Sequence, residues 1–146
     1  MPSLVYSDMC IIDRTEQGIE ESIHMAGWLA PQLTGSLSLV IHSNYLRARQ
    51  TWQAISAELP EALKVEESGE ITPYGDPAFV ASYLTALAAT YDNILMVSHL
   101  PLVGYLVQSL CPAAGAPMFA TSGLACIEWQ DGKGVLLWLE GPHTIR

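Results

Sequence analysis

The sequence predicts an α/β fold: a three-layer sandwich with a mainly parallel sheet, helices on both faces and a C-terminal hairpin. Short apolar runs typical of buried strands alternate along the chain with segments whose apolar residues recur at helical spacing. Near the end this alternation stops, and two strand-like runs flank the turn residues Gln130 to Gly134. The chain has 146 residues, half of them apolar, which is enough for one core. We therefore expect residues 1–146 to form a single domain.

The first predicted unit is a strand followed by a helix. Leu4–Tyr6 is a short strand candidate that ends at the polar break Ser7-Asp8. A helix begins at Thr15, whose hydroxyl can cap it, and ends before Pro31 and Gly35. Its apolar residues recur at helical spacing: Ile19, Ile23, Ala26 and Leu29.

A second strand and helix follow. Leu37–Ile41 is a β-type run that ends at the polar break His42-Ser43-Asn44. Tyr45–Leu59 is predicted to be helical. Its apolar side consists of Leu46, Ala54, Ile55 and Leu59. The turn residues of Ile71–Pro77 then indicate a loop.

The last part of the chain contains two more helices and three strands. Phe79–Ala89 is a predicted helix that leads into the apolar strand Ile94–Val97. A further helix, Leu102–Leu110, ends at Cys111-Pro112, because proline does not continue a helix. The two hairpin strands are predicted at Leu124–Trp129 and Val135–Leu139.

Composition limits the partners. Only six residues are Lys or Arg and the net charge is −9, which argues against nucleic acid and anionic membranes as ligands. No apolar stretch reaches the length of a membrane span, and Met1–Leu4 has no features of a signal peptide. The cysteines Cys10, Cys111 and Cys126 are odd in number and lack metal-ligand spacing. We expect a cytoplasmic protein that needs no metal and no cofactor.

Two of the predicted strands end in polar residues that could bind an anion. Ser43 follows one strand, with Arg47 four residues later, and Ser98-His99 follows the other. Ligands of open α/β sheets bind beyond the carboxyl ends of the strands. An arginine beside a helix N-terminus forms a phosphate site, and a nearby histidine can donate a hydrogen bond or exchange a proton. If the two strands are neighbours, Ser43, Arg47 and His99 would share one phosphate-binding site.

These residues also carry a family resemblance. Ser43–Thr51 resembles the Ser-x-x-x-Arg-Ala-x-Gln-Thr signature of the histidine phosphatase superfamily. Glu70–Asp76 and Ser98–Val107 are similar to segments of the SixA-type phosphohistidine phosphatases, as are Pro117–Phe119 and Thr121-Ser122. The resemblance extends from about Thr15 to Trp129 and implies a phosphoglycerate mutase-like fold.

The resemblance implies metal-free chemistry in which a histidine takes up the phosphoryl group. That histidine belongs to an Arg-His-Gly motif directly after the first strand, and a second histidine and several arginines surround the phosphate. Arg47 matches a phosphate-binding arginine of the family, and His99 matches the second histidine. Ser7-Asp8-Met9 falls where Arg-His-Gly belongs, so Asp8 occupies the nucleophile position. An arginine expected shortly before the first helix is also missing.

The missing motif predicts impaired catalysis. A carboxylate at about 4 Å repels each phosphate charge by roughly 4 kcal/mol at an effective dielectric constant near 20. We therefore expect weak or absent phosphohistidine hydrolysis, with binding retained at Arg47, His99 and Ser43. The ligand would be a small phosphate or a His-bearing or phosphohistidine-bearing segment of a histidine kinase or phosphocarrier domain. Two alternatives remain: an active phosphatase that uses His99 or Asp8, and a subunit whose site is idle.

Overall fold

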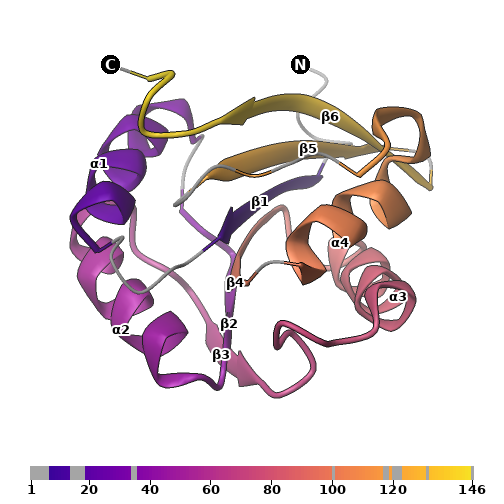
Figure 1. Cartoon of the computed structure of the whole chain (residues 1–146), viewed down its shortest axis with the longest axis horizontal. Helices are drawn as coiled ribbons and strands as arrows, with labels where there is room; N and C mark the ends of the chain where they lie inside the picture. Colours follow the sequence, from indigo (N-terminus) through magenta and orange to yellow (C-terminus); the bar gives the residue numbers. More distant parts are fainter. Residues whose placement is uncertain are drawn as a thin grey trace.

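The computed structural model describes residues 7–13, 19–33, 36–99, 101–116, 119, 123–130 and 132–145. In this part of the chain, six strands form one sheet in the order β3-β2-β4-β1-β5-β6 (Figure 1). The strands are β1 (Ser7–Asp13), β2 (Leu39–Ser43), β3 (Val65–Ser68), β4 (Asn93–Ser98), β5 (Leu124–Gln130) and β6 (Lys133–Glu140). The helices are α1 (Ile19–Leu29), α2 (Leu46–Ile55), α3 (Pro77–Ala88) and α4 (Leu102–Leu110). Short 3-10 helices cover Ala30–Gln32, Ser56–Glu58 and Pro112–Ala114.

The sheet is parallel over four strands and antiparallel at one end. β3, β2, β4 and β1 run parallel to one another, whereas β5 is antiparallel to β1 and β6 to β5. Helices α1 and α2 cover one face of the sheet, and α3 and α4 cover the other (Figure 1). The α/β prediction with helices on both faces and a C-terminal hairpin is confirmed.

Side-chain alternation along the central strands builds two cores. Leu39 and Ile41 of β2 face the side of α3 and α4, whereas Val40 faces the side of α1 and α2. β4 divides in the same way, with Met96 in the first core and Val97 in the second. Because both faces of a central parallel strand are buried, such a strand is apolar throughout and is easily recognised in the sequence.

Helix α3 begins two residues before its predicted start. Asp76 caps it, since its carboxylate accepts a hydrogen bond from the amide of Ala78 at 3.0 Å. Pro77 occupies the first helical position, where its missing N–H costs no hydrogen bond. The turn-rich sequence before Phe79 therefore includes the start signal of the helix as well as the loop.

The N-terminal prediction needs correction. Ser7-Asp8 was expected to end the first strand, but these residues begin β1 instead. The strand candidate Leu4–Tyr6 and the capping residue Thr15 lie outside the described residues. The apolar run Cys10-Ile11-Ile12 forms the part of β1 that pairs with Leu95–Val97 of β4. The prediction was wrong because an apolar run of the same length lies upstream and competed with this one.

Strand β3 was not predicted at all. Its sequence, Val65-Glu66-Glu67-Ser68, alternates between exposed and partly buried residues and carries two carboxylates. It lies at the edge of the sheet beside β2 and is only four residues long. A short, polar edge strand lacks the apolar run that identifies central strands.

Candidate functional site

Parallel strands bring four polar strand ends to the same edge of the sheet. β2 ends at Ser43 and pairs with β3, which ends at Ser68; β4 ends at Ser98 and pairs with β1, which ends at Asp13. β2 and β4 are direct neighbours, with His42 opposite Val97. The neighbourhood required for Ser43 and His99 to share a site is therefore present at this carboxyl edge.

Ser43 turns the chain from β2 into helix α2. Its side chain is buried, and its Oγ accepts a hydrogen bond from the amide of Tyr45 at 3.1 Å. Tyr45 is the N-cap of α2, and Arg47 is exposed in the first turn of this helix. The carboxyl end of β2 thus combines a serine, the positive end of a helix dipole and an arginine, as the sequence predicted.

His99 follows β4 directly and is buried, with 6% of its surface exposed. Its imidazole ring lies 5.0 Å from the ring of Tyr45, centroid to centroid, with 50° between the two planes. Its carbonyl oxygen accepts a hydrogen bond from the amide of Val103 in α4 at 3.1 Å. Sequence reasoning did not single out Tyr45, although the structure makes it the aromatic neighbour of the predicted histidine.

Ser98 connects the end of β4 to the loop that precedes α3. Its buried hydroxyl donates a hydrogen bond to the carbonyl oxygen of Ile71 at 2.7 Å. This contact joins residues that are 27 positions apart. Ser98 therefore fixes the position of the loop Ile71–Pro77, while His99, the next residue, lies against Tyr45.

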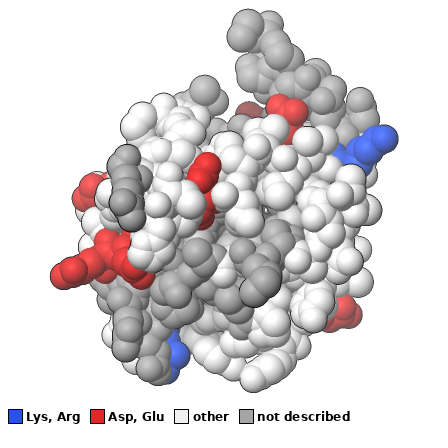
Figure 2. Space-filling view, turned by 45° about the horizontal axis from the view of Figure 1, so that its top comes forward, with Lys and Arg blue, Asp and Glu red and all other residues white. Residues whose placement is uncertain are grey.

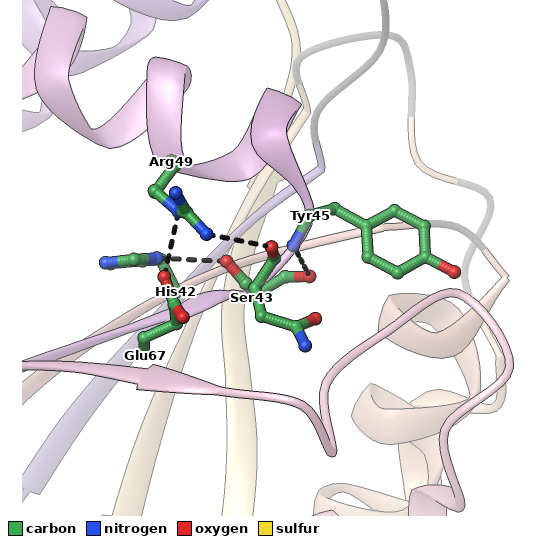
Figure 3. Close-up of polar contacts among 6 residues, drawn as sticks. His42, Ser43, Tyr45, Arg49 and Glu67 are labelled. Carbon is green, nitrogen blue, oxygen red and sulfur yellow. Dashed lines mark hydrogen bonds and ion pairs between the residues drawn. The ribbon is translucent and has the colours of Figure 1, made fainter.

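A second polar group lies on the other side of Ser43 from the ring of Tyr45 (Figure 3). Arg49 Nε lies 2.9 Å from Glu67 Oε1, and Arg49 Nη2 donates a hydrogen bond to the carbonyl oxygen of Asn44 at 3.5 Å. His42, opposite Glu67 in the parallel register, is buried, and its Nδ1 donates to the carbonyl oxygen of Ser43 at 3.0 Å. Arg49 therefore holds the β2–α2 turn against β3, and His42 has a structural contact.

The polar group at the other end of β3 belongs to the surface. Lys64 Nζ lies 3.1 Å from Glu66 Oε2, and this hydrogen bond and the opposite charge raise the pKa of Lys64. The hydroxyl of Tyr83 in α3 donates to Glu66 Oε1 at 3.3 Å, and burial followed by the charge of Glu66 raises the pKa of Tyr83. Lys64 precedes β3 and so lies at the opposite edge of the sheet from Ser43.

The register of β1 contradicts the predicted position of Asp8. Asp8 pairs with Asn93, the first residue of β4, whereas Asp13 pairs with Ser98, the last. Five residues of extended strand separate Asp8 from Asp13, or about 17 Å at 3.3 Å per residue. Asp8 therefore lies at the opposite end of the sheet from His99 and does not occupy the nucleophile position. The upstream strand prediction shifted the expected motif by nearly the whole length of β1.

The corrected register still gives no histidine at the end of the first strand. The residues that follow Ile12 in the sequence are Asp13, Arg14 and Thr15, and the first histidine of the chain is His24. His24 lies on α1 and is exposed. Asp13 is thus the residue that the sequence analysis missed at the carboxyl edge of β1.

The amino-acid sequence is similar to that of a protein named as a phosphatase. It is 39% identical over 134 residues to a protein from Escherichia coli named phosphohistidine phosphatase SixA, covering 90% of this chain and 83% of that protein. The chain belongs to the SixA phosphohistidine phosphatase family. No family model matches it.

Solved structures of the SixA family and of more distant proteins share this fold. A structure of the protein histidine phosphatase SixA complexed with tungstate superimposes with a TM-score of 0.86 at 33% identity, over 95% of this chain and 99% of that one. A phosphoglycerate mutase from Plasmodium falciparum has a TM-score of 0.68 at 14% identity, over 92% of this chain and 90% of that one. The predicted phosphoglycerate mutase-like fold is confirmed.

No described helix is long and apolar enough to cross a bilayer. In the same part of the chain, no group of three His, Cys, Asp or Glu residues could hold a metal ion.

Proposed function

We propose that this SixA-family chain binds a phosphoryl group, free or carried by a histidine of another protein, and hydrolyses it weakly or not at all. The observation that carries the proposal is the end of β1, where Asp13 pairs with Ser98 and no histidine occurs before His24 in the sequence. The family resemblance implies a nucleophilic histidine at that place. An imidazole nitrogen is a neutral nucleophile at pH 7, whereas an aspartate enters as an anion.

Retained groups on the neighbouring strands support binding. Arg47 would donate to phosphoryl oxygens, and the N-terminus of α2 would add the positive end of its dipole. His99, buried against Tyr45, would donate a hydrogen bond to the same anion. Ser43, in contrast, uses its Oγ to accept from the amide of Tyr45, so its role would be to shape the turn.

The partner follows from the chemistry of the site. The relative from Escherichia coli is named for phosphohistidine, and the tungstate complex of a SixA structure shows that a tetrahedral oxyanion binds to this fold. We propose as partner a phosphohistidine-bearing or His-bearing segment of a histidine kinase or phosphocarrier domain. A small phosphate ligand is the alternative. The buried thiols of Cys111 and Cys126 are free, which supports a reducing, cytoplasmic setting.

Two measurements on the same preparations test the proposal. Isothermal titration with tungstate and vanadate measures binding, and release of phosphate from a phosphohistidine peptide measures hydrolysis. We expect wild type to bind both oxyanions, Arg47→Ala to bind them at least about tenfold more weakly, and all variants to hydrolyse the peptide slowly.

Each outcome decides one part of the proposal. Hydrolysis at the rate of an active SixA protein, lost in His99→Ala, would overturn impaired catalysis and favour an enzyme with another nucleophile. Absence of oxyanion binding in wild type would favour an idle site. Binding that Arg47→Ala leaves unchanged would refute the assigned position of the anion.

A further inference from the structure

Strand β6 forms the outer edge of the sheet on the side away from β3. In the part of the chain that the structure describes, β5 is its strand neighbour, and its other edge faces outward. Between Lys133 and Glu140 the strand reads Gly-Val-Leu-Leu-Trp-Leu and contains no charge. Val135 is 54% exposed and Leu137 is 47% exposed. Figure 2 turns the top of the view in Figure 1, where β6 lies, toward the viewer and shows separate acidic groups among uncharged residues.

An edge strand presents unpaired backbone N–H and C=O groups, and native proteins protect it with a charge, a proline or a β-bulge. Of these three devices, the interior of β6 has only an irregularity, at the register shift between Cys126 and Ile127. Here the charged residues stand only at the two ends of β6. The whole chain has a net charge of −9, so the absence of carboxylates within this strand is a local feature.

We infer that β6 pairs with β6 of a second copy of this chain, antiparallel about a two-fold axis, so that one sheet continues through both copies. The charges are complementary in this arrangement. When Lys133 of one copy lies opposite Glu140 of the other, two-fold symmetry repeats the same ion pair at the other end of the strand.

The irregular pairing of β5 and β6 makes that register consistent. Lys133 pairs with Gln130, Val135 with Glu128, Trp138 with Cys126 and Glu140 with Leu124, and these four β5 residues alternate at two-residue steps. They therefore lie on one face of the sheet. The register shift between Cys126 and Ile127 is what brings Val135 and Trp138 to the same face although three positions separate them.

The register that pairs the end charges also pairs the apolar side chains. Val135 of one copy then lies opposite Trp138 of the other, on the same face as the two ion pairs. A β-branched residue opposite an aromatic one is a favourable cross-strand pair. A single register thus pairs the opposite charges and the apolar side chains, and it places all of them on the same face of the sheet. This agreement supports a second copy as the partner over an unrelated protein.

We expect the dimer to be weak. Eight residues of strand make a smaller contact than the interface of a stable complex, and two copies of net charge −9 repel each other. Sedimentation velocity should therefore show a monomer at low concentration and a dimer as the concentration rises toward about 1 mM. Val135→Lys and Leu137→Lys should abolish the dimer, because each places a charge within the edge. Leu63→Lys, at a residue 71% exposed and outside β6, is the matched control and should leave it intact.

Charge reversal tests the register. Lys133→Glu and Glu140→Lys should each weaken the dimer about tenfold, because both ends of the strand become repulsive. The double variant carries both substitutions and should restore the affinity, since the two ends are again opposite in charge. Circular dichroism of every variant checks that it remains folded.

Three results would overturn the inference: a protein that stays monomeric at the highest concentration, a dimer unaffected by Val135→Lys and Leu137→Lys, or single charge reversals that the double variant does not repair. A monomer in which the outward-facing amides of β6, those not directed at β5, are nevertheless protected from hydrogen exchange would assign the edge to another segment of the same chain. Association only with a different protein would likewise refute pairing between copies.

Discussion

Asp13 pairs with Ser98, the residue directly before His99, so the carboxyl end of β1 lies beside the strand end that carries the buried histidine. Asp8 pairs with Asn93 at the far end of the same two strands. This register decides where the Arg-His-Gly motif that the family resemblance implies would have to be introduced, and it excludes residue 8 from that position.

Replacing Asp13-Arg14-Thr15 by Arg-His-Gly should restore measurable phosphohistidine hydrolysis. The new histidine would follow the strand end that pairs with Ser98, in the position that the family resemblance assigns to the nucleophile. Phosphate release from a phosphohistidine peptide measures the effect, and we expect a gain of at least about tenfold over wild type.

The same three substitutions at Ser7-Asp8-Met9 provide the matched control. That graft lies at the other end of β1 and should give no gain. Equal activity of the two grafts, or activity of the second alone, would refute the register. If neither graft is active, residues 14–18 must differ from the family in more than the motif.

Tyr45→Ala should weaken tungstate binding by about two- to tenfold, because an aromatic pair contributes about 0.5–1.5 kcal/mol beyond its buried area. The ring of Tyr45 lies against His99 and limits the orientations of the imidazole. Tyr45→Phe keeps the ring and should bind like wild type. Tyr105→Ala, at an exposed tyrosine near the start of α4, is the control. An equal loss in Tyr45→Phe would instead assign the effect to the hydroxyl.

Alanine substitutions of Arg47 and Arg49 should have different effects on oxyanion binding, although the two residues lie only two positions apart in the sequence. Arg49 is engaged by Glu67 and the carbonyl oxygen of Asn44, so Arg49→Ala should cost less than about 1 kcal/mol of stability and change oxyanion affinity little. Arg47→Ala should reduce oxyanion affinity, because this arginine lies in the first turn of α2 at the proposed anion site. Isothermal titration and urea unfolding of both variants distinguish the two roles, and the reverse pattern would exchange them.

Ser98→Ala should destabilise the protein by about 1–3 kcal/mol, because it leaves the buried carbonyl oxygen of Ile71 without its hydrogen bond. Ser56→Ala removes an exposed hydrogen bond to Gln53 and should have a much smaller effect. The free energy of unfolding in urea measures both. A similar loss in the two variants would show that the contact with Ile71 is no stronger than an exposed one.

Burial raises the pKa of the Cys111 thiol from 9.0 to about 11. The folded state therefore holds this proton more tightly than the unfolded chain does. The contribution of the protonated thiol to the free energy of unfolding is fully present below pH 9.0 and is lost as the pH rises toward about 11. The free energy of unfolding should fall across this window, and less steeply in Cys111→Ala. Alkylation located by mass spectrometry should leave Cys111 unmodified at pH 8 until urea is added. Rapid modification of the folded protein would contradict the burial.

The sequence was most informative where strands are central and helices follow them. Buried runs such as Ile94–Val97 are recognisable because both faces of the strand are covered, and the polar residues directly after them identified Ser98-His99. Two features were missed. β3 is short, polar and at an edge of the sheet, so the sequence gives no indication of this strand. The ion pair between Glu67 of β3 and Arg49 could therefore not be predicted either. At the N-terminus two candidate runs followed one another, and only the pairing of β1 with β4 distinguishes them.

The polar ends at the carboxyl edge come from separate strands, each held by its own contacts: the amide of Tyr45 at Ser43, and the carbonyl of Ile71 at Ser98. Under the proposed function, a change confined to the end of β1 would therefore leave the other ligand-binding groups in place. Under the proposed function, a chain that holds a phosphorylated partner without cleaving it would compete with an active relative for that partner. It would thereby prolong the lifetime of the phosphohistidine on that partner.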